Sequence, residues 1–205
     1  MEQHIIAISG GGFSEIPNAY IDQYVLNVKR QTEPLRIGFI ATASNDAPGY
    51  IDKFYKAFKH EIPTHISVAD FQSPTIQDTV NALDIIYVGG GNTKFMLDTW
   101  RKTDFDTVLK TAYANGVILA GISAGAMCWF EHCYSSEGDH FNGLGLLRGA
   151  LLPHADADSI ANFLSWANDK QISPAYHLQD EENLHFINGK LVAKIIERGI
   201  THDTV

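Results

Sequence analysis

The chain has 205 residues, of which 45% are hydrophobic and 19% are charged, and its formal net charge is −9 at pH 7. This size and composition are typical of a folded globule, so we expect residues 1–205 to form a single domain. The negative charge gives no electrostatic support for binding nucleic acid or an acidic membrane surface, so we expect neither partner.

The first residues and the two cysteines bear on the cellular location. The chain runs from Met1 directly into an apolar stretch without a basic leader, so we expect no signal peptide. No apolar run approaches the roughly 20 residues that a membrane-spanning helix needs. Cys128 and Cys133 lie five positions apart on a partly helical segment, which disfavours a disulfide between them. We therefore expect a reduced, cytoplasmic protein.

Apolar runs and amphipathic segments alternate along the first 120 residues. The predicted strands are 4–9, 35–42, 64–69, 84–88 and 117–120. The predicted helices between them are 20–30, 50–60, one within 73–83, 93–101 and 105–115. Such alternation is typical of βαβ units, and it predicts a three-layer α/β fold with a mostly parallel sheet covered by helices on both faces.

The last third of the chain has a different character. A helix is predicted at 155–167, and the short runs 175–179, 184–187 and 191–196 suggest antiparallel strands. Asn188-Gly189 stands between the last two runs and is a strong hairpin signal. We therefore expect the parallel sheet to be followed by a short antiparallel C-terminal hairpin.

The most informative motif is Gly121-Ile-Ser123-Ala-Gly125, which follows the apolar run 116–120 and precedes helix-forming residues. The order strand, sharp turn, helix is the context of a nucleophile elbow, in which the serine takes a strained backbone conformation. The two glycines would let the strand and the helix pack closely behind it. Ser123 is therefore the candidate nucleophile, and the alternative is a serine that only caps a helix.

Glycine-rich loops follow two other predicted strands, at 10–12 and 89–91. Ligands bind at the carboxyl ends of parallel strands, where these loops would lie. The N–H groups of the second loop, together with that of Ala124, could form an oxyanion hole. Alternatively, 89–91 is a tight turn with Asn92 or Thr93 as helix cap. Phosphate binding is disfavoured because no Gly-Lys-Ser/Thr ending follows.

A serine nucleophile needs a base and an acid. His154 follows Pro153 and the apolar residues before it, which places it at a strand end with its direction fixed by proline. His132 lies nine positions beyond Ser123, where a continuing elbow helix would carry it away from the serine. The candidate acids that give the chain order serine, acid, histidine are Glu137 and Asp139, in the polar loop 135–139.

Two further carboxylates, Asp156 and Asp158, lie just beyond His154 and are also candidates for the acid. Position alone does not separate these two from the pair that precedes the histidine. The acidic residues and histidines of this region match no zinc or calcium spacing, so we expect no metal and no cofactor.

Three strings in order, Val88-Gly-Gly-Gly-Asn-Thr93, Gly121-Ile-Ser-Ala-Gly-Ala126 and Leu152-Pro-His154, resemble the aspartyl dipeptidase (peptidase E) and cyanophycinase group of serine peptidases. The resemblance spans nearly the whole chain. It implies a class I glutaminase amidotransferase-like (flavodoxin-like) fold in which serine replaces cysteine.

By the same resemblance Ser123 is the nucleophile, His154 the base, and Gly90 or Gly91 with Ala124 the oxyanion hole. The relatives place an acid shortly after the nucleophile, which points to Glu137, with Asp139 as the alternative.

The resulting prediction is a serine peptidase that cuts short peptides through an acyl-enzyme, acting as a monomer or homodimer. Asn92 and Thr93 are candidate substrate-binding residues. Dipeptidases of the group accept an N-terminal aspartate, whose carboxylate needs a cation. Lys94 and Arg148 flank the motifs, but each also fits a solvated surface charge.

Two alternatives remain open. An α/β-hydrolase esterase shares the elbow, but the 31 positions between Ser123 and His154 leave little room for the strands and helices that such a fold places there. The other is a non-catalytic ligand-binding or regulatory protein with a degenerate triad. A structure with no carboxylate within hydrogen-bonding reach of the His154 ring would favour that second alternative.

Overall fold

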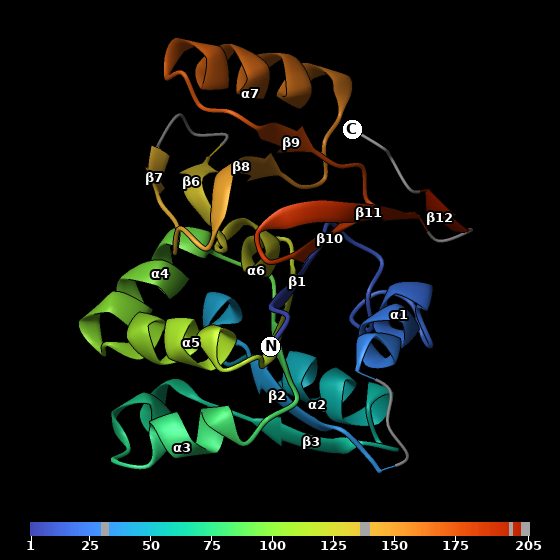
Figure 1. The fold of residues 1–205 in the computed structure, drawn as a ribbon, viewed down its shortest axis with the longest axis vertical. Coiled ribbons are helices and arrows are strands. Elements are labelled where there is room, and N and C mark those ends of the chain that lie inside the picture. The colour runs from blue at the N-terminus through green and yellow to red at the C-terminus, as the bar shows by residue number, and fades with distance from the viewer. Residues whose placement is uncertain (30–32, 136–139, 197–198, 202–205) are drawn as a thin grey trace.

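A computed structural model describes residues 1–29, 33–135, 140–196 and 199–201. Its main sheet has eight strands in the described residues, in the order β12-β11-β10-β1-β5-β4-β2-β3 (Figure 1). Their bounds are β1 His4–Ile8, β2 Arg36–Ile40, β3 Ile62–His65, β4 Ile85–Val88, β5 Ile118–Ile122, β10 Glu182–Ile187, β11 Lys190–Ile196 and β12 Gly199–Thr201.

The five strands from β1 to β5 run parallel to one another, and β10, β11 and β12 add an antiparallel extension. The strands β10 and β11 form the hairpin expected around Asn188-Gly189, and both of these turn residues have positive φ. The first of the two strands pairs with β1, so the C-terminal hairpin extends the parallel sheet from its β1 edge.

Helices cover both faces of this sheet (Figure 1). One face holds α1 (Tyr20–Val28) and α2 (Pro48–Ala57), and the other holds α3 (Ile76–Asn81), α4 (Thr93–Lys102) and α5 (Phe105–Ala114). Each side has its own buried core, with Phe39 and Phe54 in the first and Trp100 and Phe105 in the second. The three-layer α/β prediction is confirmed.

A second sheet follows the elbow, and the sequence did not predict it. It contains β6 (Phe130–Tyr134), β7 (His140–Asn142), β8 (Leu147–Leu152) and β9 (Ala175–His177) in the order β7-β6-β8-β9. Helix α7 (Ala157–Asp169) packs beside it, with Phe163 and Trp166 against Tyr134.

Two local predictions in this region were wrong. The elbow helix α6 (Ala124–Met127) ends early, so His132 lies on strand β6 rather than on a continuing helix. The run 175–179 was expected to be antiparallel, but β9 pairs in parallel with β8. This pairing depends on a contact distant in sequence, because a Cβ at Gly149 would lie 1.9 Å from the Pro174 carbonyl oxygen.

The two cysteines are free and buried. Burial raises the pKa of the Cys133 thiol to about 12 and that of Cys128 well above its usual range. Both side chains therefore act as apolar core residues rather than as thiolate nucleophiles. Within the described part of the chain, no helix has the length and hydropathy to cross a membrane.

Candidate active site

Ser123 occupies the sharp turn between β5 and α6, as the elbow motif predicts. Its backbone angles are φ 55° and ψ −110°, a conformation that a residue with a side chain rarely adopts. Close packing behind the turn maintains this backbone conformation. A Cβ at Gly121 would lie 2.1 Å from the Gly125 carbonyl oxygen, and one at Gly125 would lie 2.3 Å from the Val88 carbonyl oxygen.

The helix-cap alternative for Ser123 is not what the structure shows. Its side chain makes no capping hydrogen bond to α6. Its backbone N–H instead donates to the Ile8 carbonyl oxygen at 2.9 Å, which ties the turn to the end of β1. Ser123 also lines a cavity.

His154 lines the same cavity as Ser123, and a carboxylate lies beside its ring. The imidazole Nδ1 is 2.5 Å from the Oδ1 atom of Asp180, in the loop between β9 and β10. Both side chains are accessible, with 45% of His154 and 68% of Asp180 exposed. A carboxylate at Nδ1 fixes the ring orientation and leaves Nε2 able to face the serine.

The sequence predictions did not include Asp180 as the acid, because they considered only the polar loop after the elbow and the residues directly beyond His154. The predicted acid Glu137 and its alternative Asp139 lie outside the described residues. Asp156 caps α7 by accepting a hydrogen bond from the Ser159 N–H at 2.8 Å, and Asp158 lies exposed in the first turn of that helix. The sequence signal that could have identified Asp180 is its position just after a short predicted strand, since the end of another strand lies beside it.

The loop 89–91 lies directly against the nucleophile. A Cβ at Gly90 would be 3.3 Å from the Ser123 Cβ, and one at Gly91 would be 2.2 Å from the Ala43 carbonyl oxygen. The Gly90 N–H donates to the Tyr50 hydroxyl at 3.2 Å. Within the described chain, no hydrogen-bond acceptor is found for the N–H groups of Gly91 or Ala124.

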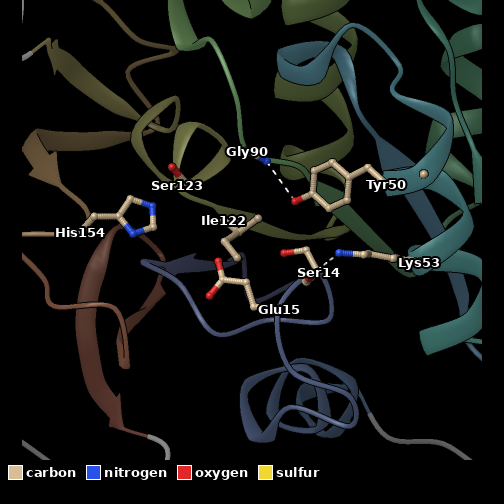
Figure 2. Close-up of a pocket in the computed structure, with 9 residues that line it drawn as sticks. Ser14, Glu15, Tyr50, Lys53, Gly90, Ile122, Ser123 and His154 are labelled. Carbon is tan, nitrogen blue, oxygen red and sulfur yellow. Dashed lines mark hydrogen bonds between the residues drawn. The ribbon is translucent and has the colours of Figure 1, made fainter.

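The cavity beside Ser123 has a volume of about 500 Å³. Figure 2 shows Ser123 and His154 on one side of it and Tyr50 and Lys53, from α2, on the other. Ser14 and Glu15, from the loop after β1, complete the wall. Sequence reasoning missed these four residues, because nothing local in the sequence places α2 or the loop after β1 beside the elbow.

A second cavity of about 470 Å³ also has His154 in its wall. The predicted substrate-binding residues Asn92 and Thr93 line it, together with apolar side chains that include Met127 and Leu152. The Asn92 side chain also caps α4, since its Oδ1 accepts the Phe95 N–H at 2.8 Å. The two cavities therefore meet at the histidine.

Neither of the two cations that the sequence suggested, Lys94 and Arg148, lines the first cavity. Lys94 lines the second cavity, and its ammonium lies 2.7 Å from the Asp98 carboxylate on the next turn of α4. Arg148 is exposed on β8 and lines neither cavity. The cation beside Ser123 is Lys53, whose Nζ donates to the Ser14 carbonyl oxygen at 2.8 Å.

A buried carboxylate lies behind the loop that carries Ser14. Asp22, on α1, accepts a hydrogen bond from the Tyr87 hydroxyl at 3.0 Å. Burial raises the pKa of Asp22 to about 7, although the bonds from Tyr87 and from the Phe13 backbone oppose the shift. A Cβ at Gly12 would be 2.8 Å from the same Tyr87 oxygen, so the loop packs tightly over this pair.

Replacing Asp22 with asparagine is expected to raise the free energy of unfolding, relative to wild type, as the pH rises from about 4 to about 7. In that window the folded carboxyl keeps a proton that the unfolded chain releases, so this residue destabilises the wild type progressively. Asparagine does not titrate, and the difference should reach about 3 kcal/mol or more above pH 7. Urea denaturation of both proteins at several pH values measures it, and a pH-independent difference would contradict the assignment.

The buried histidine His185 is unsuited to be the base. It lies between Tyr24, whose hydroxyl is 2.8 Å from its Nδ1, and His4, whose Nδ1 is 2.9 Å from its Nε2. Burial is the main cause that lowers its pKa to about 4. Among the described residues, no group of three or more His, Cys, Asp or Glu side chains is placed to hold a metal ion.

The fold and the elbow define the class of protein. A three-layer α/β fold with a strained serine after β5 and an antiparallel C-terminal extension is a class I glutaminase amidotransferase-like architecture, as the family resemblance implied. Comparisons with known proteins identify the family within this class.

The model of Peptidase family S51 matches residues 5–194. Uncharacterized peptidase YgaJ of Bacillus subtilis (strain 168) is 39% identical over 204 residues, which cover 96% of this chain and 88% of that protein. The chain therefore belongs to peptidase family S51, and it is a serine peptidase.

Two solved structures share the fold. One is a protein from Listeria monocytogenes EGD-e assigned to peptidase E, with a TM-score of 0.72, 18% identity, and coverage of 96% of this chain and 99% of that chain. The other is a peptidase from an acI-B1 Actinobacterium, with a TM-score of 0.70, 17% identity, and coverage of 99% and 88%.

Proposed function

We propose that Ser123, His154 and Asp180 form the triad of a peptidase that hydrolyses short peptides through an acyl-enzyme. The observation that carries the proposal is one cavity lined by a strained serine and by a histidine whose Nδ1 is held by a carboxylate. The carboxylate also removes the reason to favour a non-catalytic protein with a degenerate triad.

The chemistry follows from this geometry. The Ser123 Oγ forms a bond to the scissile carbonyl carbon while its proton passes to the His154 Nε2. The carbonyl oxygen becomes an oxyanion, for which the N–H groups of Gly91 and Ala124 are the donors with no other described acceptor. The Gly90 N–H is already bonded to Tyr50, so it is not assigned this role.

The carbon–nitrogen bond then breaks as His154 protonates the leaving amine. A water molecule attacks the acyl-enzyme and gives a proton to His154, and the ester bond to Ser123 breaks as His154 passes a proton to the Ser123 Oγ, which releases the acid and restores the serine. The two cavities that meet at the histidine give the acyl part and the leaving amine separate places to bind. Placing the acyl part in the first cavity puts it against Lys53 and Tyr50.

An N-terminal aspartate suits the first cavity. Lys53 donates one ammonium proton to Ser14 and has two more to offer a carboxylate. The Tyr50 hydroxyl accepts from the Gly90 N–H, lies within hydrogen-bond reach of the Ser14 side chain, and carries a proton of its own. Burial raises the pKa of Tyr50, which keeps that proton in place. Glu15 is the acidic residue of the wall and could receive the substrate ammonium.

Hydrolysis of three matched dipeptide series tests this function. Peptides that begin with Asp, Asn or Ala and share the second residue differ only in the charge and the size of the first side chain. We expect the Asp series to be cut fastest. Cleavage of all three series at equal rates would contradict the aspartate preference, whereas no cleavage of any peptide in a broad dipeptide library would contradict the peptidase proposal itself.

Lys53→Gln is expected to lower kcat/KM for the Asp series by about 10- to 100-fold, because it removes a charge-assisted hydrogen bond. The Ala series should change little, since it carries no carboxylate to pair. Lys56→Gln is the matched control, because Lys56 is exposed on the same helix and does not line the cavity. An equal loss for both series would contradict the carboxylate contact.

A further inference from the structure

The end of β1 is joined to both proposed catalytic segments. The Ile8 carbonyl oxygen accepts the N–H of Ser123 at 2.9 Å. The next residue, Ser9, is fully buried, and its Oγ accepts the N–H of His154 at 2.9 Å. Two successive residues, the last of β1 and the one that follows it, therefore hold the backbone of the nucleophile and the backbone of the base.

The same hydroxyl reaches toward the segment that carries Asp180. The Ser9 Oγ donates to the Leu178 carbonyl oxygen at 3.2 Å, two residues before the carboxylate. That oxygen also accepts the N–H of Ala155 at 2.8 Å. Gly10 continues the contact, because a Cβ there would lie 3.1 Å from the Asp180 carbonyl oxygen. The Ser9 side chain thus bridges the two loops whose side chains meet at the imidazole.

The backbone of His154 needs such a restraint. Its φ is 52°, in the left-handed region that side-chain-bearing residues rarely occupy. A residue persists in this region when its surroundings over-determine it. The bond from the His154 N–H fixes this peptide group to Ser9, the residue that follows β1, and β1 is itself paired on both sides, with β5 and with β10.

We propose that Ser9 is a positioning residue, whose hydroxyl sets the direction of His154 and its register with Asp180. It touches neither the substrate nor the reacting atoms, and the inference rests on the proposed triad. A small displacement of a base can cost about 100-fold in rate, since proton transfer requires near-contact geometry.

Ser9→Ala removes both hydrogen bonds at little change in volume. We expect kcat to fall by about 10- to 100-fold while KM stays within about twofold, because the cavity walls contain no atom of Ser9. Ser9→Thr keeps the hydroxyl and should restore most of kcat. Steady-state kinetics on the best dipeptide measures both parameters.

Thr42→Val is the matched control for loss of a buried hydroxyl. Thr42 is also fully buried, and its Oγ1 accepts the Trp100 Nε1–H at 3.1 Å in the core between β2 and α4. This variant should lose stability but keep kcat. The Tm of each protein is measured first, so that the kinetics can be compared at a temperature where every variant is folded.

Three outcomes decide the inference. A selective loss of kcat in Ser9→Ala, absent from Thr42→Val and reversed by Ser9→Thr, supports it. A kcat for Ser9→Ala equal to that of Thr42→Val overturns it, as does a folded Ser9→Thr that is as slow as the alanine variant. If Ser9→Ala does not fold, Ser9→Cys replaces it, because sulfur accepts hydrogen bonds weakly, and an undiminished kcat again overturns the role.

These outcomes are separate from failure of the proposed function. If wild-type protein reacts with a fluorophosphonate and cuts peptides while Ser9→Ala does both equally well, only the positioning role fails. If the wild-type protein does neither, the triad itself fails.

Discussion

Ser123→Ala should abolish covalent labelling by a fluorophosphonate and reduce peptide turnover by roughly 10⁴- to 10⁶-fold. The reason is that no other nucleophile is available at this turn. The neighbouring thiols of Cys128 and Cys133 are buried, and burial holds the pKa of each far above its usual range. Gel detection of the fluorescent adduct and the rate of dipeptide hydrolysis measure the two effects independently.

Ser67→Ala is the control for this experiment, because it removes a serine hydroxyl at another site. The Ser67 hydroxyl donates a hydrogen bond to Asp70 at an exposed position beside the edge strand β3. The Ser67→Ala protein should be labelled as wild type is. A Ser123→Ala protein that is still labelled at the wild-type rate would show that another residue is the nucleophile. A folded wild-type protein that resists labelling and cuts no peptide would contradict the proposed chemistry altogether.

The elbow could be predicted because its signals are local. A strand that leads into Gly121-Ile-Ser-Ala-Gly125 must turn sharply, and both glycines prove to lie where a Cβ would strike backbone atoms. The parallel sheet was predictable for the same kind of reason, since each strand and each helix can be identified from the spacing of its own hydrophobic residues. The Asn188-Gly189 hairpin is a third local signal that the structure confirms.

Features made by contacts distant in sequence were not predictable in this way. The parallel pairing of β8 with β9 depends on where Gly149 meets Pro174, which no periodicity reveals. In the sequence, Lys53 is indistinguishable from a solvated lysine on an amphipathic helix. Its role becomes visible only because the fold places that helix opposite the elbow. The chain order of serine, acid and histidine likewise constrains nothing, because a triad is defined by its geometry.

The acid is therefore the residue on which sequence and structure make different predictions. Asp180→Asn is expected to lower kcat by about 10³-fold with little change in KM. The carboxylate accepts the Nδ1 proton and so keeps Nε2 free to take the proton of Ser123, whereas the amide of asparagine can donate to Nδ1 and favour the wrong tautomer. The carboxylate also stabilises the imidazolium that forms during the reaction.

Two matched variants make this prediction decisive. Glu181→Gln neutralises an exposed carboxylate next to Asp180 in the same loop and should leave kcat unchanged. Glu137→Gln neutralises the acid that the family resemblance suggested and should also leave kcat unchanged if Asp180 orients the base. The reverse pattern, a large loss in Glu137→Gln and none in Asp180→Asn, would assign the acid to Glu137. Because all three changes replace a carboxylate with an amide, a general effect of net charge would lower kcat equally in each, so a loss confined to one variant identifies the carboxylate that acts on His154.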